Sequence, residues 1–312
     1  MEFAFTEEQE MIRDTAAAFL AEVSTSEAIR QAMATERGYD LELWQRICNE
    51  MYWQAIHVPE AHGGMGLGYV EVVAMMEQMG RHLLCSPFFS TVCLASNALL
   101  VAGTEEQQSH WLGKLCAEGL TATVAFNGGF RRWDAQSITA TYRREGEAFL
   151  LNGDYRYVID GHTSELLIVA AREEGSEGEQ GISLFLLPAD TAGVSTSWLP
   201  SMDQTRKQAS VTLADVTLNT DALMGEAGAG WTALAKVIDL ASVALAAEQV
   251  GGCQQLLDMT VDYTAERVQF NRTIASFQAV KHKAADMMLQ TEVARSGVYY
   301  AACVAQEAVS YT

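Results

Sequence analysis

The chain has 312 residues, of which 49% are hydrophobic and 19% charged, and its formal net charge at pH 7 is −20. This charge disfavours nucleic acids and anionic membrane surfaces as partners. No run reaches the roughly 20 consecutive apolar residues of a membrane span, and the acidic N-terminus is unlike a secretory leader, so we expect a cytoplasmic protein without a membrane partner. The six cysteines contain no C-x-x-C pair and the six histidines no metal-ligand spacing, which predicts reduced thiols and no metal site.

Residues 5–125 follow a helical pattern. Residues 6–9 (TEEQ) and 104–107 (TEEQ) both fit the capping box that opens many helices. Apolar residues recur at helical spacing after each cap, and again over 41–51 and 69–79. The glycine-rich loop between these helices, PEAHGGMGLG, permits tight turns, but no β-strand precedes it, so it is not a dinucleotide-binding fingerprint.

From about residue 121 to 220 the pattern changes to short β-like runs, with turns predicted at Asn152-Gly153 and Asp160-Gly161. These runs favour a small antiparallel β-domain. From Trp231 onwards the helical period returns in alanine-rich segments. We therefore predict an α+β, mostly helical fold: an N-terminal helical domain (1–120), a middle antiparallel β-domain (121–222) and a C-terminal helical bundle (223–312), the last of them incomplete.

Residues 263–287 read YTAERVQFNRTIASFQAVKHKAADM and resemble the Y-x-x-x-R-x-Q-F-G-x-x-I-x-x-F-Q-x-x-x-x-x-x-A-D-M stretch of the acyl-CoA dehydrogenase family. Four further segments are similar to family motifs in the same order: 3–9, 59–68, 151–161 and 224–231. The resemblance covers essentially the whole chain. It implies the acyl-CoA dehydrogenase fold, oxidation of acyl-CoA thioesters at Cα–Cβ, FAD as cofactor and an electron-transfer flavoprotein as electron acceptor.

In the family, the Arg and Gln of this stretch reach across a subunit interface to the pyrophosphate of a neighbour's FAD. The resemblance therefore implies that Arg267 and Gln278 bind the FAD of a partner subunit, with Phe270 packed beside them. Arginine suits this role because its forked, permanently charged donors match phosphate oxygens. We expect a helix break near Asn271, which replaces the usual Gly and tolerates a left-handed backbone.

The chain departs from the family where the home flavin and substrate would lie. Residues 127–134 (NGGFRRWD) stand at the place of the family's T-E-P-x-x-G-S-D signature, and only Asp134 matches. In the hairpin motif W-I-T, this chain has Tyr157 and Ile159 at the Trp and Thr positions. Tyr157 retains a ring that can stack on the flavin, whereas Ile159 lacks the hydroxyl that faces its polar edge. Losing such a partner for a buried polar group costs ~1–3 kcal/mol.

No catalytic base is evident. In the family, the glutamate stands either on the first C-terminal helix, where this chain has Ala241 followed by Ser242, or in helices that would lie beyond residue 312. A methyl group cannot remove an α-proton. Glu248 is the fallback candidate, because it follows Ala241 by seven residues and shares its helix face.

We therefore expect a subunit of a heteromeric, FAD-dependent acyl-CoA dehydrogenase of the steroid side-chain type, which completes the FAD site of a second acyl-CoA dehydrogenase-like subunit. Two alternatives stay open. One is a homomeric acyl-CoA dehydrogenase whose base lies beyond residue 312, and the other is a scaffold pseudo-enzyme that binds no flavin.

Overall fold

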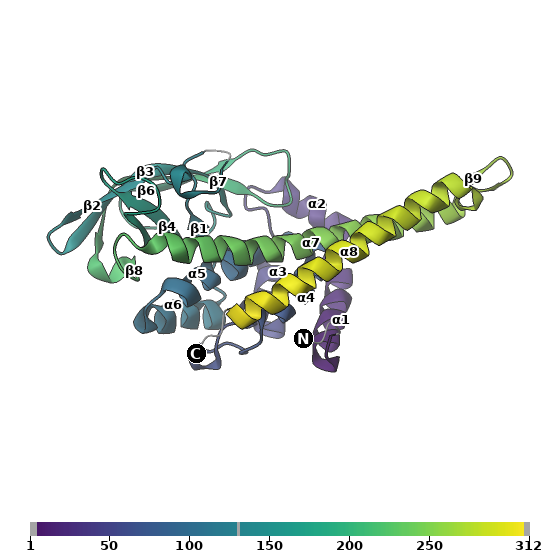
Figure 1. Cartoon of the computed structure of the whole chain (residues 1–312), viewed down its shortest axis with the longest axis horizontal. Helices are drawn as coiled ribbons and strands as arrows, with labels where there is room; N and C mark the ends of the chain where they lie inside the picture. The colour runs from purple at the N-terminus through teal and green to yellow at the C-terminus, as the bar shows by residue number, and fades with distance from the viewer. Residues whose placement is uncertain (1–4, 130–131, 309–312) are drawn as a thin grey trace.

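The computed structural model of the chain describes residues 5–129 and 132–308. Three parts follow one another along the chain, and Figure 1 shows a β-sheet part and a helical part on either side of one long helix, α7. The first part contains α1 (Glu7–Val23), α2 (Ser26–Ala34), α3 (Leu41–Arg46), α4 (Tyr69–Arg81), α5 (Asn97–Ala102) and α6 (Glu105–Glu118), with short helical turns η1 (Ile47–Met51), η2 (Trp53–Ala55), η3 (Glu60–His62) and η4 (Phe89–Ser96). Both predicted capping boxes are confirmed, at the starts of α1 and α6.

The second part is an eight-stranded sheet. Its strands are β1 (Ala122–Ala125), β2 (Thr141–Glu145), β3 (Ala148–Ile159), β4 (Leu166–Glu173), β5 (Ile182–Pro188), β6 (Val194–Leu199), β7 (Gln208–Asn219) and β8 (Leu223–Met224), with short turns η5 (Ala135–Ser137) and η6 (Thr220–Ala222). The strand order is β6-β7-β3-β2-β4-β5-β8, and β1 pairs with β4. The pairings β1–β4 and β2–β4 are parallel, so the sheet is mixed and not wholly antiparallel as predicted.

The turn predicted at Asn152-Gly153 is wrong. Both residues lie inside the 12-residue strand β3, where the pairing with β7 shifts register. Gly153 has a φ of 151°, and a Cβ added there would lie 2.5 Å from Ala140. The glycine therefore allows a β-bulge at which two backbones lie close together. An Asn-Gly dipeptide occurs in hairpin turns as well as in such bulges, so the sequence alone does not distinguish the two.

The third part is a helical hairpin. Helix α7 (Gly230–Glu266) runs for 37 residues and is followed by a ribbon of β9 (Val268–Gln269) and β10 (Arg272–Thr273), the turn η7 (Ile274–Ser276) and helix α8 (Gln278–Ala308). The predicted break is confirmed, and Asn271 has the left-handed backbone expected of it, with a φ of 60°. The distal halves of α7 and α8 project from the body as an arm with the ribbon at its tip (Figure 1).

Helix α7 is long and apolar enough, by length and composition alone, to cross a membrane, with a mean hydropathy of 1.4 in its most apolar window. This differs from the sequence expectation because small residues, mainly alanine, raise the average without a long run of large apolar side chains. The same helix packs along the buried helix α4 and alongside α8. Its apolar character is thus used in packing between elements of the fold.

The crossing of α4 and α7 depends on two glycines. A Cβ added to Gly80 would lie 1.9 Å from the carbonyl oxygen of Glu248, and one added to Gly251 would lie 1.8 Å from that of Glu77. Backbone atoms cannot move aside as a flexible side chain can. Glycine at both positions therefore sets the spacing that brings α7 against the N-terminal helices.

Replacing Gly251 with alanine should destabilise the protein. Overpacking against backbone typically costs about 1–3 kcal/mol, which exceeds the ~1 kcal/mol gained from better helix propensity. The matched control is Gly297→Ala in α8, where an added Cβ meets nothing within 4 Å. Thermal unfolding should show a lower Tm for G251A and an unchanged or higher Tm for G297A. Equal changes of Tm in the two variants would refute the role assigned to Gly251 at the crossing of α4 and α7.

Candidate functional site

A pocket of about 350 Å³ lies where the three parts of the fold meet. The helical part contributes Phe89 from η4, the sheet contributes Val158 and its neighbours from β3, and α7 contributes Ala241. Its described lining comprises Phe89, Leu94, Val124, Phe126, Asn127, Trp133, Arg156, Tyr157, Val158, Ile159, Gln208, Ile238, Ala241, Ser242 and Leu245. Among these residues there is no aspartate or glutamate, so the described pocket walls offer no carboxylate base.

The residues at the expected base position do line this pocket. Ala241 has only a methyl group to present, and the Ser242 hydroxyl donates a hydrogen bond of 2.7 Å to the carbonyl oxygen of Ile238, one turn earlier in the same helix. A serine bonded back to its own helix has no adjacent base to activate it. Neither side chain is therefore equipped to remove an α-proton.

Glu248 lies away from the pocket lining and is held in an ion pair. Its Oε1 lies 2.6 Å from Nη2 of Arg206, and both side chains are about one-fifth exposed. The guanidinium of Arg206 also lies over the ring of Phe89, 4.5 Å from its centroid, directly behind the pocket wall. A carboxylate paired at this distance to a half-buried arginine is a structural counter-ion in this geometry, and its use as a base would require breaking the pair.

Asp160 is a second buried carboxylate behind the same wall. Its Oδ2 accepts a hydrogen bond of 2.7 Å from the hydroxyl of Ser90, and the residue is 4% exposed. Burial raises the pKa of Asp160 from its ordinary 3.8 to about 6, against the opposing effects of the Ser90 hydrogen bond and the Arg206 charge. Arg206, Glu248 and Asp160 thus form a cluster with one cation and two carboxyl groups, which carries a net charge of −1 when both are ionised.

The mouth of the pocket is aromatic and basic. Tyr157 lines it in a left-handed conformation, with a φ of 64°, and is 54% exposed, while Ile159 lines the deeper wall. Trp133 is 55% exposed and packs edge-on against Phe126, with ring centroids 5.9 Å apart. Two positions of the altered 127–134 segment, 130 and 131, lie outside the described residues. The remainder places a bulky ring where the family signature has small residues.

The predicted FAD-binding residues of the 263–287 stretch lie far from this pocket. Arg267 follows the last residue of α7, Phe270 is 87% exposed at the ribbon turn, and Gln278 is exposed at the start of α8. From Ser242 to Glu266 the helix rises about 36 Å, at 1.5 Å per residue. These residues therefore cannot serve the pocket of their own chain, because the ribbon between α7 and α8 lies at the end of the projecting arm (Figure 1).

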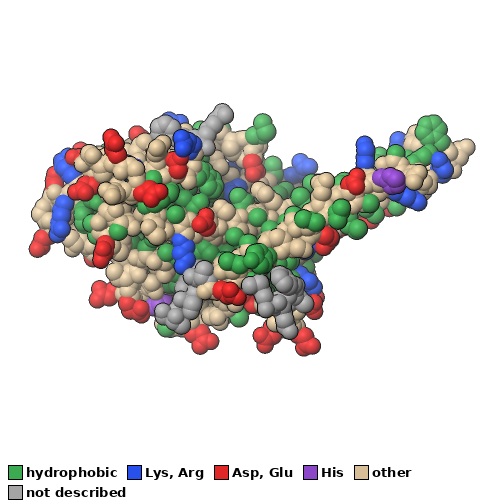
Figure 2. All heavy atoms as spheres, viewed as in Figure 1, with side chains coloured by type: hydrophobic (Ala, Val, Ile, Leu, Met, Phe, Trp, Pro, Cys, Tyr) green, Lys and Arg blue, Asp and Glu red, His purple; other side chains and the backbone are tan. Residues whose placement is uncertain are grey.

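Apolar side chains are exposed along the whole arm (Figure 2). Large apolar residues at least 36% exposed on the distal arm are Leu256, Met259, Val261, Tyr263, Val268, Phe270, Met287, Met288, Leu289 and Val293. Exposed large apolar side chains gathered on one segment are typical of an interaction surface.

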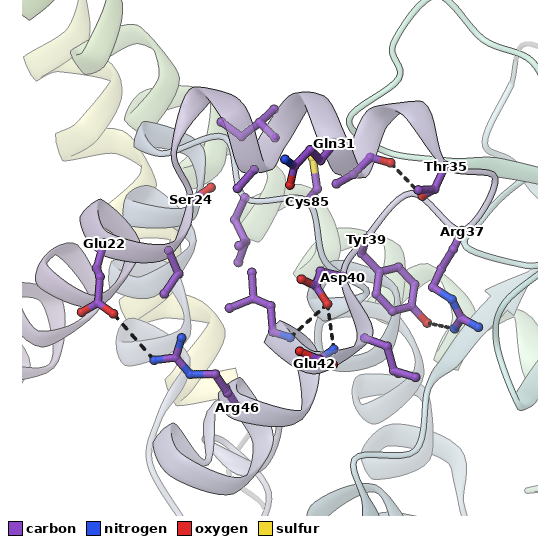
Figure 3. A pocket seen from close by; sticks show the side chains of 17 residues that line it. Glu22, Ser24, Gln31, Thr35, Arg37, Tyr39, Asp40, Glu42, Arg46 and Cys85 are labelled. Atoms are coloured by element: carbon purple, nitrogen blue, oxygen red, sulfur yellow. Dashed lines mark hydrogen bonds and ion pairs between the residues drawn. The ribbon is translucent and has the colours of Figure 1, made fainter.

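Among the larger hollows in the described parts of the chain, two contain polar groups that are already paired with one another. One, about 660 Å³ between α2 and α3, is drawn in Figure 3: the Asp40 carboxylate accepts hydrogen bonds from the first turn of α3, and Arg37 bonds the Tyr39 hydroxyl. The other, about 1070 Å³ between α1, α4 and α8, contains the ion pair of Arg295 with Glu77 at 2.9 Å. Neither therefore presents a set of free functional groups comparable to the pocket at α7.

Sequence reasoning missed Arg206 and Arg156. Arg206 precedes β7 next to Lys207, and this pair of cations in an acidic chain was the available signal. Lys207 is 2% exposed, and its Nζ donates to the carbonyl oxygen of Met33 at 2.8 Å. Arg156 lies in β3 at the pocket mouth, and no carboxylate in the described parts of the chain lies within ion-pair distance of it.

Comparisons with known proteins agree with the three-part fold. Models of the N-terminal, middle and C-terminal domains of acyl-CoA dehydrogenase match residues 6–119, 131–216 and 228–309. Acyl-CoA dehydrogenase IpdE2 of Mycolicibacterium smegmatis is 32% identical over 295 residues, which cover 94% of this chain and 76% of that protein.

Two solved structures are similar in fold and in sequence. A variant of the Tcur3481-Tcur3483 steroid ACAD has a TM-score of 0.85 and 28% identity, over 96% of this chain and 78% of that one. The ChsE4-ChsE5 complex of Mycobacterium tuberculosis has a TM-score of 0.87 and 25% identity, over 99% and 81%. With all three domain models matched in order, the α+β fold predicted from the sequence is confirmed, and the chain belongs to the acyl-CoA dehydrogenase family.

Proposed function

We propose that this chain is one subunit of a heteromeric, FAD-dependent acyl-CoA dehydrogenase that desaturates a bulky acyl-CoA of the steroid side-chain class. The observation that carries the proposal is the separation of two half-sites in one chain. The pocket at α7 has no carboxylate in its described lining, whereas the arm presents Arg267 and Gln278 about 36 Å away along the helix. A partner subunit that supplies the base would make this division functional.

The residues of the arm fit the part of FAD that they would hold. Arg267 is exposed and follows a helix end, and Gln278 begins the next helix, so both present donors outward from the arm tip. Charge-assisted donors of this kind suit a diphosphate. Bound FAD would supply the hydride-accepting ring. In the partner's site, Arg267 and Gln278 of this chain would bind the diphosphate of that FAD.

The substrate class and the assembly draw support from the relatives. IpdE2 is named as an acyl-CoA dehydrogenase, and two similar structures are a steroid ACAD and a two-component ChsE4-ChsE5 complex. The exposed apolar faces of α7 and α8 provide surface for such an association. An electron-transfer flavoprotein as acceptor follows from the family resemblance and forms part of the proposal.

The test is the flavin content per chain, measured by absorbance for the protein alone and after co-expression with an acyl-CoA dehydrogenase-like partner. We expect a colourless chain alone and a yellow complex with one FAD per pair of chains. One FAD per chain in the protein alone would overturn the proposal in favour of a homomeric enzyme, whose base would be Glu248 or lie beyond residue 312. A complex that stays colourless would favour a scaffold without flavin.

A further inference from the structure

Arg272 lies on the same face of the ribbon as Arg267. In the ribbon, Arg272 pairs with Gln269, and the amide of Ile274 donates a hydrogen bond of 2.8 Å to the carbonyl oxygen of Arg267. Side chains alternate between the two faces of a strand, and directly paired residues share a face. One face of the ribbon therefore carries Arg267, Gln269 and Arg272. The two arginines are diagonal neighbours on this face, and the Cα atoms of such neighbours typically lie roughly 7–8 Å apart.

The guanidinium of Arg272 is held in place by an aromatic ring. Its central carbon lies 4.0 Å from the centroid of the Phe277 ring, and Phe277 in turn packs edge-on against Phe270 at 6.1 Å. Stacking occupies the flat face of a guanidinium and leaves its N–H edge free to donate. Phe277 directly precedes Gln278, so the stack places Arg272 beside the second position expected to contact FAD.

The tip carries a local charge opposite to that of the chain. Residues 266–283 contain Arg267, Arg272, Lys281 and Lys283 against the single carboxylate of Glu266, within a chain of net charge −20. Figure 2 shows Lys and Arg side chains gathered near the end of the arm. In the described parts of the chain, no carboxylate lies within ion-pair distance of Arg272. A basic tip on an acidic protein, with an oriented and unpaired guanidinium, indicates an anionic ligand.

We propose that Arg272 is a second diphosphate-binding residue of the arm, acting beside Arg267. This inference rests on the proposed function and extends it to a residue that the family motif leaves unspecified. A diphosphate has non-ester oxygens on two neighbouring phosphorus atoms, so two guanidinium groups on one face can each pair with one phosphate. Both FAD and coenzyme A contain a diphosphate, and we assign the FAD of the partner subunit as the ligand.

The test compares ligands with and without the diphosphate. The co-expressed complex, stripped of flavin, is titrated with FAD, FMN and coenzyme A, and binding is followed calorimetrically. For Arg272→Ala we expect FAD affinity to fall about tenfold, because one charge-assisted contact is lost, while FMN and coenzyme A affinities stay unchanged. Arg272→Lys should recover part of the loss, since it keeps the charge without the fork.

Arg144→Ala is the matched control, because it removes an exposed arginine that also stacks on a ring, that of Phe149 at 5.9 Å, on β2 in the sheet. It should leave FAD affinity as in wild type. If FAD affinity were unchanged in R272A but clearly reduced in Arg267→Ala, the inference about Arg272 would be overturned and the proposed function would stand. A loss confined to coenzyme A would overturn the assignment to FAD, and a wild-type complex that takes up no FAD would overturn the proposed function and the inference with it.

Discussion

Replacing Arg267 with alanine is expected to remove most of the flavin from the assembled complex. The side chain is exposed at the end of α7, so the substitution takes away no packing within the chain. A charge-assisted pair with phosphate contributes about 2–3 kcal/mol, so FAD should bind about 30- to 150-fold more weakly. The measurement is the 450 nm absorbance per complex after gel filtration, together with the dissociation constant of added FAD.

Two controls separate this result from a loss of assembly. The complex should keep its elution volume and Tm without flavin added, because Arg267 makes no described ion pair within its own chain. Arg267→Lys should show an intermediate affinity, since an ammonium replaces a forked donor with a point charge. Wild-type flavin content in R267A would exclude the arm from the FAD site, and a complex that falls apart would make Arg267 an assembly residue.

Local sequence signals predicted those elements that depend on interactions between residues close together in the sequence. A capping box needs only two side chains three residues apart, so both boxes could be read directly from the sequence, and the return of the helical period at Trp231 corresponds to α7. The Asn152-Gly153 signal failed because the residues around it pair with β7, a strand more than 50 residues away. The Asn-Gly dipeptide carries no information about pairing with so distant a strand.

The site could be predicted only in part for the same reason. Ala241, Tyr157 and Ile159 come from two separate motifs of the sequence and line one pocket. Glu248 shares the helix of Ala241, but its partner Arg206 belongs to the β-domain, 42 residues earlier, and only the packed fold brings the two together. A carboxylate's neighbours decide whether it is a base or a counter-ion, and sequence spacing does not report them.

Replacing Asp160 with asparagine should stabilise the protein at neutral pH and make its stability less dependent on pH. The raised pKa of Asp160, about 6 instead of 3.8, means that the folded protein favours the protonated form. The ionisation penalty is therefore absent below about pH 3.8, grows as the pH rises through about 6, and is fully present above that, where two pKa units correspond to about 3 kcal/mol. Asparagine is neutral at every pH and can still accept the hydrogen bond from Ser90.

The expected gain for D160N is about 1–3 kcal/mol in the free energy of unfolding at pH 7.5, shrinking towards zero near pH 4. Asparagine also tolerates the left-handed backbone at this position, where φ is 53°. Asp215→Asn isolates that second effect, because Asp215 is left-handed but exposed, with a φ of 51°. Urea unfolding of both variants at pH 4.5, 6 and 7.5 makes the comparison. If D160N were instead less stable at pH 7.5, the attraction between Asp160 and Arg206 would outweigh the cost of burying the charge, and the cluster would depend on both carboxylates.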